Sequence, residues 1–378
     1  MIYLDNNATT PIDPLVRGAM LPFLGEQFGN PSSPHAPGRA AREAVDKARG
    51  QVAALLGARA DEIVFTSGGT ESINTAIRGA LAAQPGKRHI VTSSIEHSAT
   101  KNLCEQLERE GCEVTWLRVD TCGNPDLDEY RSALRDDTAV VSVVWANNET
   151  GVLFPIGEMA RLADGRRIVF HADAVQAAGK IPIDLSRVPV HLLSLSAHKI
   201  HGPKGVGALF VRSGLGLSPL LRGGNQENGR RAGTENVSGI VGFGAAAELA
   251  KSALVGETSR IAKLRDDFEN GVRTRFSQAR FHGAPDRRLP NTSNFALPGL
   301  AATDLLAALD RLGICCSVGS ACVSGSPHAS HVLRAMGVGD DEAKSSLRFS
   351  FSRMNTPDEV KGALAALDES ARRLGLGG

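Results

Sequence analysis

Short apolar runs alternate with helical patterns along most of the chain, and this alternation constrains the fold more than any other feature. Runs with the length and composition of buried strands occupy residues 62–66, 88–92, 113–117, 139–145, 168–172, 191–196 and 205–211. Amphipathic helical patterns such as 38–56 and 73–83 accompany them. Strands that alternate with helices form a mainly parallel, doubly wound sheet. The sequence therefore predicts an α/β fold with a mainly parallel seven-stranded sheet.

The pattern changes near Ser252, where a long helical stretch begins. Short strand-like runs follow among helices at 294–297, 314–317 and 347–350. This mixture is typical of a separate α+β lobe, and 378 residues exceed the length of one ordinary domain. We expect two domains, a large one at 14–251 and a small one made of 1–13 with 252–378.

Charge and hydropathy narrow the classes of partner. Lys and Arg total 42 and Asp and Glu total 41, for a net charge of +1. Such a balance provides no global field toward nucleic acid or an anionic membrane. Residues 1–11 lack the basic and apolar parts of a signal peptide, and apolar runs such as 139–146 are too short to span a bilayer. We expect a cytoplasmic protein that binds small molecules or proteins and makes no direct contact with membrane or nucleic acid.

The cysteines favour reduced thiols over a disulfide framework. The chain has six, and none forms a C-x-x-C pair, which argues against a zinc knuckle. We expect no resident metal and free thiols, one of which could be reactive.

Polar side chains follow four of the predicted strands. A single cluster of this kind is more often an ordinary loop. The clusters are Glu96 with His97, residues 147–150, Asp173 with Gln176, and His198 with Lys199. Because open α/β sheets bind ligands at the carboxyl ends of their strands, the four together predict a site at this edge.

The stretch 192–205, LLSLSAHKIHGPKG, ends one predicted strand in a Gly/Pro-rich turn. A lysine in such a turn is usually a solvated surface charge. Lys199, flanked by serine and histidine, could instead be a Schiff-base lysine whose neighbours hold a phosphate. The turn 67–72, SGGTES, joins a strand to a helix, and free N–H groups at a helix N-terminus bind anions. Glycine turns alone are more often plain connections.

These groups match the requirements of pyridoxal phosphate. That cofactor needs an amine to bond, a carboxylate against its ring nitrogen and donors around its phosphate. Lys199 and Asp173 supply the first two. The donors could come from Gly69, Thr70, Ser196 and His198. His97 could stack on the ring, although a histidine after a strand is more often a satisfied polar residue.

Ten short strings occur in order between Tyr3 and Arg353. They are LDNNATTP, FGNPSS, FTSGGTES, EH at 96–97, WANNETG, HADAVQAAGK, SLSAHKIHGPKG, RRAGTEN, GSAC and LRFSFSR. Together they resemble the cysteine desulfurases, in the class-V branch of fold-type-I pyridoxal phosphate enzymes. WANNETG with LLRGG and GRRAGTEN is most similar to the nitrogen-fixation (NifS) and housekeeping members. The resemblance implies an L-cysteine desulfurase that supplies sulfur to an acceptor or an iron–sulfur scaffold protein.

The resemblance also implies roles for individual residues. Lys199 would be the Schiff-base lysine, and His97 would stack on the ring and help to move protons. The remaining cofactor contacts would be Asp173 at the ring nitrogen, Gln176 and Asn148 near the ring hydroxyl, and Gly69, Thr70, Ser196 and His198 at the phosphate. Thr234, in RRAGTEN, would reach the phosphate of the other subunit of an obligate homodimer.

Substrate contacts follow from the same resemblance. Arg348 would clamp the substrate carboxylate with help from Asn30, because a planar guanidinium binds carboxylates through two hydrogen bonds. Cys322, in SVGSACVSGS, falls on the catalytic cysteine, and its Gly/Ser-rich loop would let a thiolate take up sulfur and deliver it. A transient contact of Cys322 with an iron–sulfur cluster is the one metal contact implied. Cys315 and Cys316 are interpreted as structural.

The sequence differs from the family at two places, and several alternative functions stay open. The string SGSPHASH after Cys322 differs from the common one, and the end RRLGLGG is shorter than the tails that some relatives use to dock scaffold proteins. The reach of the loop and the choice of partner are therefore open. The alternatives are a selenocysteine lyase, another class-V enzyme such as an aminotransferase, or a catalytically silent assembly scaffold. Nitrogenase, general iron–sulfur assembly and tRNA thiolation are the candidate destinations of the sulfur.

Overall fold

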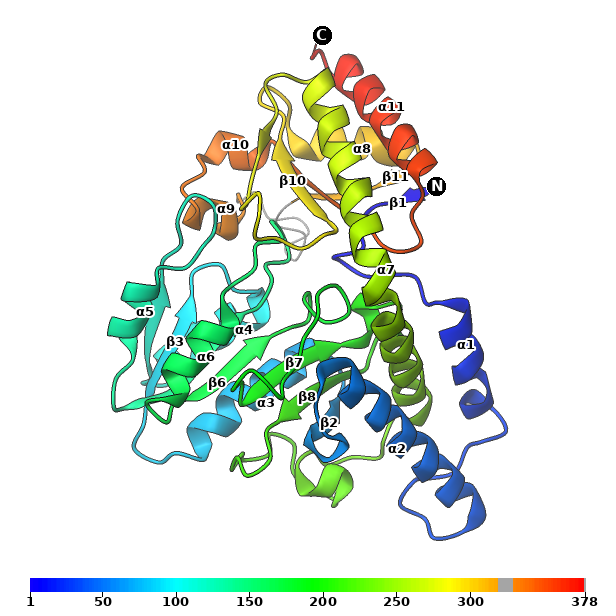
Figure 1. Cartoon of the computed structure of the whole chain (residues 1–378), viewed down its shortest axis with the longest axis vertical. Helices are drawn as coiled ribbons and strands as arrows, with labels where there is room; N and C mark the ends of the chain where they lie inside the picture. The colour runs from blue at the N-terminus through cyan, green and yellow to red at the C-terminus, as the bar shows by residue number, and fades with distance from the viewer. Residues whose placement is uncertain (319–328, 377–378) are drawn as a thin grey trace.

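A seven-stranded sheet forms the centre of the larger lobe in the computed structural model, which describes residues 1–318 and 329–376 (Figure 1). The strands, in spatial order, are β2 (Ile63–Thr66), β8 (Gly207–Val211), β7 (Leu192–Ser196), β6 (Val169–Asp173), β5 (Thr138–Val144), β3 (His89–Ser93) and β4 (Glu113–Leu117). Only β8 runs antiparallel to its neighbours β2 and β7. The predicted α/β fold with a mainly parallel seven-stranded sheet is confirmed.

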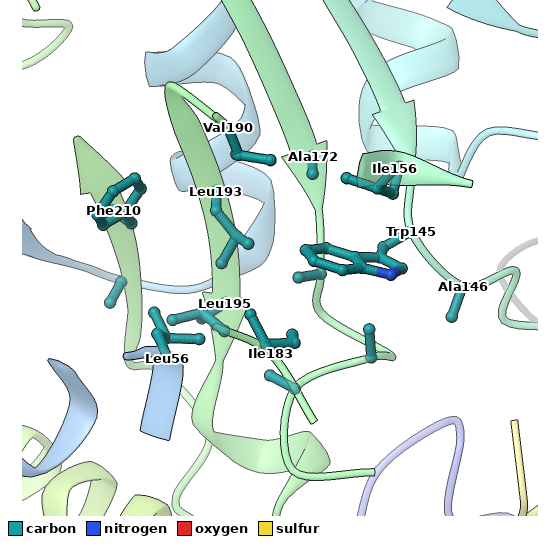
Figure 2. Packing of buried hydrophobic residues seen from close by; sticks show 14 of the residues in the cluster. Leu56, Trp145, Ala146, Ile156, Ala172, Ile183, Val190, Leu193, Leu195 and Phe210 are labelled. Atoms are coloured by element: carbon teal, nitrogen blue, oxygen red, sulfur yellow. The ribbon is translucent and has the colours of Figure 1, made fainter. Parts of the chain in front are cut away.

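Helices cover both faces of this sheet. They are α2 (Ala36–Leu56), α3 (Gly69–Ala82), α4 (Ser98–Arg109), α5 (Leu127–Ala133), α6 (Ile156–Asp164) and α7 (Val237–Arg275). Successive strand residues point to opposite faces, so Val64 packs with α3 and α4 while Phe65 packs with α2, α6 and α7. Figure 2 shows the second of these clusters, with Leu193 of β7 beside Trp145 and Phe210. Burial on both sides explains why the strands read as continuous apolar runs.

The smaller lobe has its own core around an antiparallel sheet. Its strands, in spatial order, are β12 (Ser317–Val318), β13 (Ser346–Ser350), β10 (Thr292–Ala296) and β9 (Arg280–Phe281). Its helices are α8 (Ala302–Arg311), α9 (His331–Ala335), α10 (Asp340–Lys344) and α11 (Pro357–Arg373). The ring of Phe268 lies 4.7 Å from that of Phe349, 5.6 Å from Phe351 and 6.2 Å from Phe295. This aromatic group anchors the second core.

Helix α7 joins the two cores, as Figure 1 shows. Its first half places Phe243 in the large core, and its second half places Phe268 in the small one. The expected boundary between 251 and 252 therefore falls inside one continuous helix. Among the described residues α7 alone is long and apolar enough to cross a membrane by length and composition, a test that buried core helices also pass. It packs against α2, α11 and α1 (Pro14–Met20).

The N-terminal segment reaches the junction between the lobes. β1 (Ile2–Tyr3) pairs in parallel with β11 (Ile314–Cys315), and Leu4 is buried in the small core. Asn6 then donates from Nδ2 to the carbonyl of Ser350 at 2.8 Å. Residues 5–8 are thereby brought to the carboxyl edge of the large sheet. The remaining short elements are η1 (Leu21–Leu24), η2 (Ala60–Glu62), η3 (Ala197–Lys199) and η4 (Gln226–Gly229).

Three expected elements differ from the structure. The long helical stretch expected from near Ser252 begins earlier, at Val237, as α7. The run 314–317, expected as one strand, is divided at Cys316 into β11 and β12, because β11 pairs with β1 and β12 pairs with β13. The helix expected at 73–83 begins earlier, at Gly69, so that the glycine turn supplies its first turn.

Removal of the Phe268 ring tests the packing of the second core. Phe268→Ala should lower the free energy of unfolding by about 3–5 kcal/mol, because removal of the ring leaves a cavity that the neighbouring side chains can fill only in part. The measurement is urea denaturation followed by circular dichroism. Val255→Ala, at a position 96% exposed on the same helix, should change stability by at most about 0.5 kcal/mol. Equal losses in the two variants would contradict this packing.

Candidate active site

A cavity of about 320 Å³ opens at the carboxyl ends of β5, β6 and β7. The predicted site residues in its wall are Gly69, Thr70, His97, Asn148, Asp173, Gln176, Ser196, His198, Lys199 and Arg348. Asn30 and Thr234 are exposed and do not line it. Cys322 lies outside the described residues. The clusters that follow separate strands in the sequence thus converge on one space.

Lys199 ends η3, directly after β7. Its Nζ donates to the carbonyl of Asn7 at 2.6 Å and to that of Ala8 at 2.8 Å. Both Asn7 and Ala8 line the cavity, and the sequence analysis assigned them no role beyond the family string LDNNATTP. No local sequence pattern predicts that Asn7 and Ala8 line the site. Their position depends on the pairing of β1 with β11, which lies far along the chain.

Asp173 is the last residue of β6 and is buried beneath the cavity. Its Oδ1 accepts a hydrogen bond from the Val175 N–H at 2.9 Å. Burial raises the pKa of Asp173, while His97 and Lys199 act in the opposite direction. His97 caps α4, since its Nδ1 accepts from the Ala99 N–H at 3.1 Å. That bond makes Nδ1 a hydrogen-bond acceptor at the start of the helix.

The N-terminus of α3 forms one end of the cavity. Gly69 and Thr70 lie in its first turn, where main-chain N–H groups have no partner within the helix. A Cβ at Gly69 would lie 2.9 Å from a methyl carbon of Val175, so glycine keeps this end open. Ser196, at the end of β7, stands beside the same turn.

His198 lies at the same end of the cavity as α3. Its Nδ1 is 3.1 Å from the Thr9 hydroxyl. Burial, reinforced by the positive charges of Lys199, Lys204 and Lys180, lowers the pKa of His198 to about 4. The ring is therefore neutral at pH 7, with one nitrogen that donates and one that accepts.

Arg348 brings β13 of the small lobe to the cavity wall. Its side chain is 2% exposed; Nη1 donates to the carbonyl of Asn148 at 3.0 Å, and Nη2 donates to Asp5 Oδ1 at 2.7 Å. Its Nε is buried and has no hydrogen-bond partner in the described part of the chain. A guanidinium with a donor to spare can bind a carboxylate, which it does best through two hydrogen bonds.

Glu96 is a buried acid to which the sequence analysis gave no role. Its Oε1 accepts from the Val144 N–H at 2.9 Å and from the Ser93 hydroxyl. Burial raises the pKa of Glu96 to about 8, with a smaller contribution from the charge of Asp173. A protonated Glu96 thus ties the end of β3 to the end of β5, next to His97.

The donor set fits pyridoxal phosphate. The cavity combines a lysine amine, a buried carboxylate and a helix N-terminus flanked by a serine hydroxyl and a neutral histidine. The fit also depends on glycine at position 69, because a Cβ there would lie too close to the Val175 side chain at the cavity wall. Within 1–318 and 329–376, no group of three or more His, Cys, Asp or Glu side chains is arranged to hold a metal ion.

Comparisons with known proteins agree with this geometry. The model of the class-V aminotransferase family matches residues 2–362. Cysteine desulfurase NifS of Azotobacter vinelandii is 53% identical over 360 residues, which are 95% of this chain and 90% of that protein. Cysteine desulfurase 2 of Trichormus variabilis is 50% identical over 374 residues, covering 99% of this chain and 94% of the relative.

A solved structure is also similar in fold to this chain. The NifS-like protein from Rickettsia africae superposes with a TM-score of 0.89 at 34% identity, covering 98% of this chain and 99% of that one. The family match and both relatives span nearly the whole sequence. The chain therefore belongs to the class-V aminotransferase family of pyridoxal phosphate-dependent enzymes.

Proposed function

We propose that the protein is an L-cysteine desulfurase, which takes the sulfur from L-cysteine, releases L-alanine and carries the sulfur as a persulfide on Cys322. The observation that carries the proposal is one cavity that joins Lys199 and Asp173 to Arg348, an arginine whose Nε has no hydrogen-bond partner in the described residues. Relatives named cysteine desulfurase, 50% and 53% identical over nearly the whole chain, support the reaction.

Pyridoxal phosphate, when bound, supplies an electron sink for the substrate carbon. Lys199 would hold it through Nζ, and His97 would stack on its ring. The other contacts would be Asp173 at the ring nitrogen, Asn148 and Gln176 near the ring oxygen, and Gly69, Thr70, Ser196 and His198 at the phosphate. A cationic ring nitrogen would favour the ionised form of Asp173, whose pKa burial raises.

The protein's own groups would manage the substrate and its protons. Lys199 Nζ, held by two carbonyls at the wall, is placed to accept and return a proton, with His97 as a second carrier. The guanidinium of Arg348 would bind the substrate carboxylate. Asn30 accepts from the Ser32 N–H in an exposed loop, and its help at the carboxylate stays a prediction.

Sulfur transfer would use Cys322. Its thiolate sulfur would bond the substrate sulfur while the substrate carbon–sulfur bond breaks; the electron pair stays on carbon, which takes a proton to give alanine. Burial raises the pKa of Cys104 and of Cys316, and raises that of Cys315 as well. These thiols form thiolates less readily, which favours Cys322 as the sulfur carrier.

Partners and location extend the proposal. The persulfide sulfur would pass to an acceptor or to an iron–sulfur scaffold protein, with Cys322 in transient contact with the growing cluster. The choice among acceptors stays open, and the cytoplasmic location stays a prediction.

A homodimer would complete the site. Apolar side chains are exposed between residues 12 and 28, among them Leu21, Leu24 and Phe28, the last 81% exposed. A second hollow, lined by Glu71 and Lys204, adjoins the α3 end of the cavity. A second copy of the chain would cover the apolar residues and fill this hollow.

Ion pairs hold the segment that would enter the partner. Arg231 pairs with Glu71 at 2.9 Å, and Arg42 pairs with Glu235 at 3.0 Å. Thr234, between these two anchors, is exposed and does not line its own cavity. Its predicted contact with the partner's phosphate is consistent with that position.

Substitution of Cys322 separates sulfur transfer from cofactor binding. Cys322→Ala should bind pyridoxal phosphate normally and change absorbance when cysteine is added, yet form alanine at least about a hundredfold more slowly, because a methyl group cannot accept sulfur. Cys315→Ala and Cys316→Ala should keep turnover within a few-fold. Wild type treated with cysteine and no reductant should gain one sulfur on the Cys322 peptide by mass spectrometry.

If Cys322→Ala formed alanine at the wild-type rate, the persulfide mechanism would be wrong. A lyase that acts without an enzyme persulfide, such as a selenocysteine lyase, would then be the better assignment, and the relative rates with cysteine and selenocysteine would identify it.

The guanidinium of Arg348 makes a kinetic prediction. Arg348→Lys keeps the charge but removes the paired donors, so KM for cysteine should rise about tenfold or more while the cofactor stays bound. Steady-state rates of alanine formation give KM and kcat. Arg334→Lys, at an exposed position, is the control and should match wild type. An unchanged KM in Arg348→Lys would place the carboxylate elsewhere.

Subunit complementation tests the shared site. Thr234→Ala and Lys199→Ala homodimers should each be weakly active or inactive, whereas their heterodimer has one site with both residues intact. Random mixing should therefore restore roughly a quarter of the wild-type rate. Leu24→Glu with Phe28→Glu should shift the protein toward monomer in sedimentation. Full activity of a monomer, or no gain on mixing, would contradict the dimer.

A further inference from the structure

A second lysine, Lys180, lies beside the active site, and the proposed chemistry does not use it. Its Nζ donates to Gln176 Oε1 at 2.6 Å and to Asn7 Oδ1 at 3.0 Å. Burial, reinforced by the charges of Lys199 and Arg348, lowers the pKa of Lys180 well below its ordinary value. Even a neutral amine keeps two N–H groups, and the structure offers two acceptors.

These contacts fix the amide of Gln176 in one orientation. Its Nε2 donates to the carbonyl of Asn7 at 2.8 Å, so its Oε1 must face the donor on Lys180. A flipped amide would set its oxygen against the Asn7 carbonyl and lose that bond. Gln176 lines the cavity, and its Nε2 retains a second N–H. Gln176 therefore presents Nε2, a hydrogen-bond donor, to a ligand oxygen that accepts a hydrogen bond.

Asn7 is the second residue that Lys180 holds. Its Oδ1 also accepts from Asn291 Nδ2 at 3.0 Å. Its Nδ2 donates to the carbonyl of Asn148 at 3.1 Å and to the Thr292 hydroxyl at 2.8 Å. Both polar atoms of the Asn7 side chain therefore already have two hydrogen-bond partners each. A shift of Asn7 would also move its carbonyl, which accepts the bond from Lys199 Nζ.

We propose that Lys180 is a positioning residue: it bridges Gln176 and Asn7, and thereby holds a donor at the cavity wall and a carbonyl against Lys199. The inference rests on the proposed function only in that the cavity holds pyridoxal phosphate. Loss of the bridge leaves Gln176 Oε1 without its donor and Asn7 Oδ1 with the bond from Asn291 alone, so the side chains rearrange and bind the cofactor less well.

A structural role would give a different result. A lysine that only stabilised the fold would lower the melting temperature when replaced, whereas a positioning residue lowers the affinity for the ligand. Methionine fills the space of the lysine stem and removes the cost of burying the amine. Lys180→Met is therefore expected to leave the melting temperature of the apoprotein within about 3 °C of wild type and to affect ligand binding alone.

The test is titration of the apoproteins with pyridoxal phosphate, followed by absorbance. Lys180→Met should raise Kd at least about tenfold, the consequence of one lost buried hydrogen bond. Lys180→Arg should return Kd to within about threefold, since arginine donates to both oxygens. A second cavity of about 50 Å³ beside Lys180 gives the larger group room. Lys251→Met, at an exposed position of α7, is the matched control and should bind as wild type does.

A double-mutant cycle identifies the path of the effect. If Lys180 acts through Gln176, Lys180→Met should weaken binding much less when Gln176→Ala is already present. Wild-type Kd in Lys180→Met, no rescue by Lys180→Arg, additive effects in the cycle, or a melting temperature more than about 10 °C below wild type would each overturn the proposal. Cofactor binding is measured without cysteine, so failure of the desulfurase mechanism would leave this result intact.

Discussion

The arrangement of the site depends on the hydrogen bonds that residues 5–8 make at the carboxyl edge of the sheet. Asp5 pairs with Arg348 from the small lobe, and the carbonyl of Asn7 accepts bonds from Lys199 and Gln176 of the large lobe. A buried arginine left without its partner typically costs 3–5 kcal/mol, so the segment cannot leave without disturbing both lobes. Pairing of β1 with β11 fixes where the segment enters.

This dependence explains which parts of the site the sequence could reveal. The strands were predictable because both faces of the sheet are buried, which makes them continuous apolar runs. Asp173 and Lys199 were predictable because each follows such a run, and carboxyl ends of parallel strands share an edge. Asn7 and Asp5 carry no local signal of this kind. Their contacts in the site join residues between 141 and 343 positions apart, and only the folded chain brings them together.

The same reasoning accounts for the errors in the small lobe. Residues 314–317 look like one apolar strand, yet β11 and β12, on either side of Cys316, pair in two different sheets. A local apolar pattern indicates only that residues are buried, and β11 and β12 each have one buried and one partly buried residue. Which sheet each half joins is decided by β1 and β13, from opposite ends of the sequence. Periodicity could not distinguish these pairings.

Two buried carboxyl groups at this edge, Glu96 and Asp173, are subject to different nearby charges. Glu96 is buried with two donors to one oxygen, and burial raises its pKa to about 8. Asp173 is also buried, but His97 and Lys199 oppose the rise in its pKa. Like charges confined together cannot both ionise at low cost, so a neutral Glu96 removes one obstacle to the ionised form of Asp173. A cationic ring nitrogen at this strand end would favour that ionised form further.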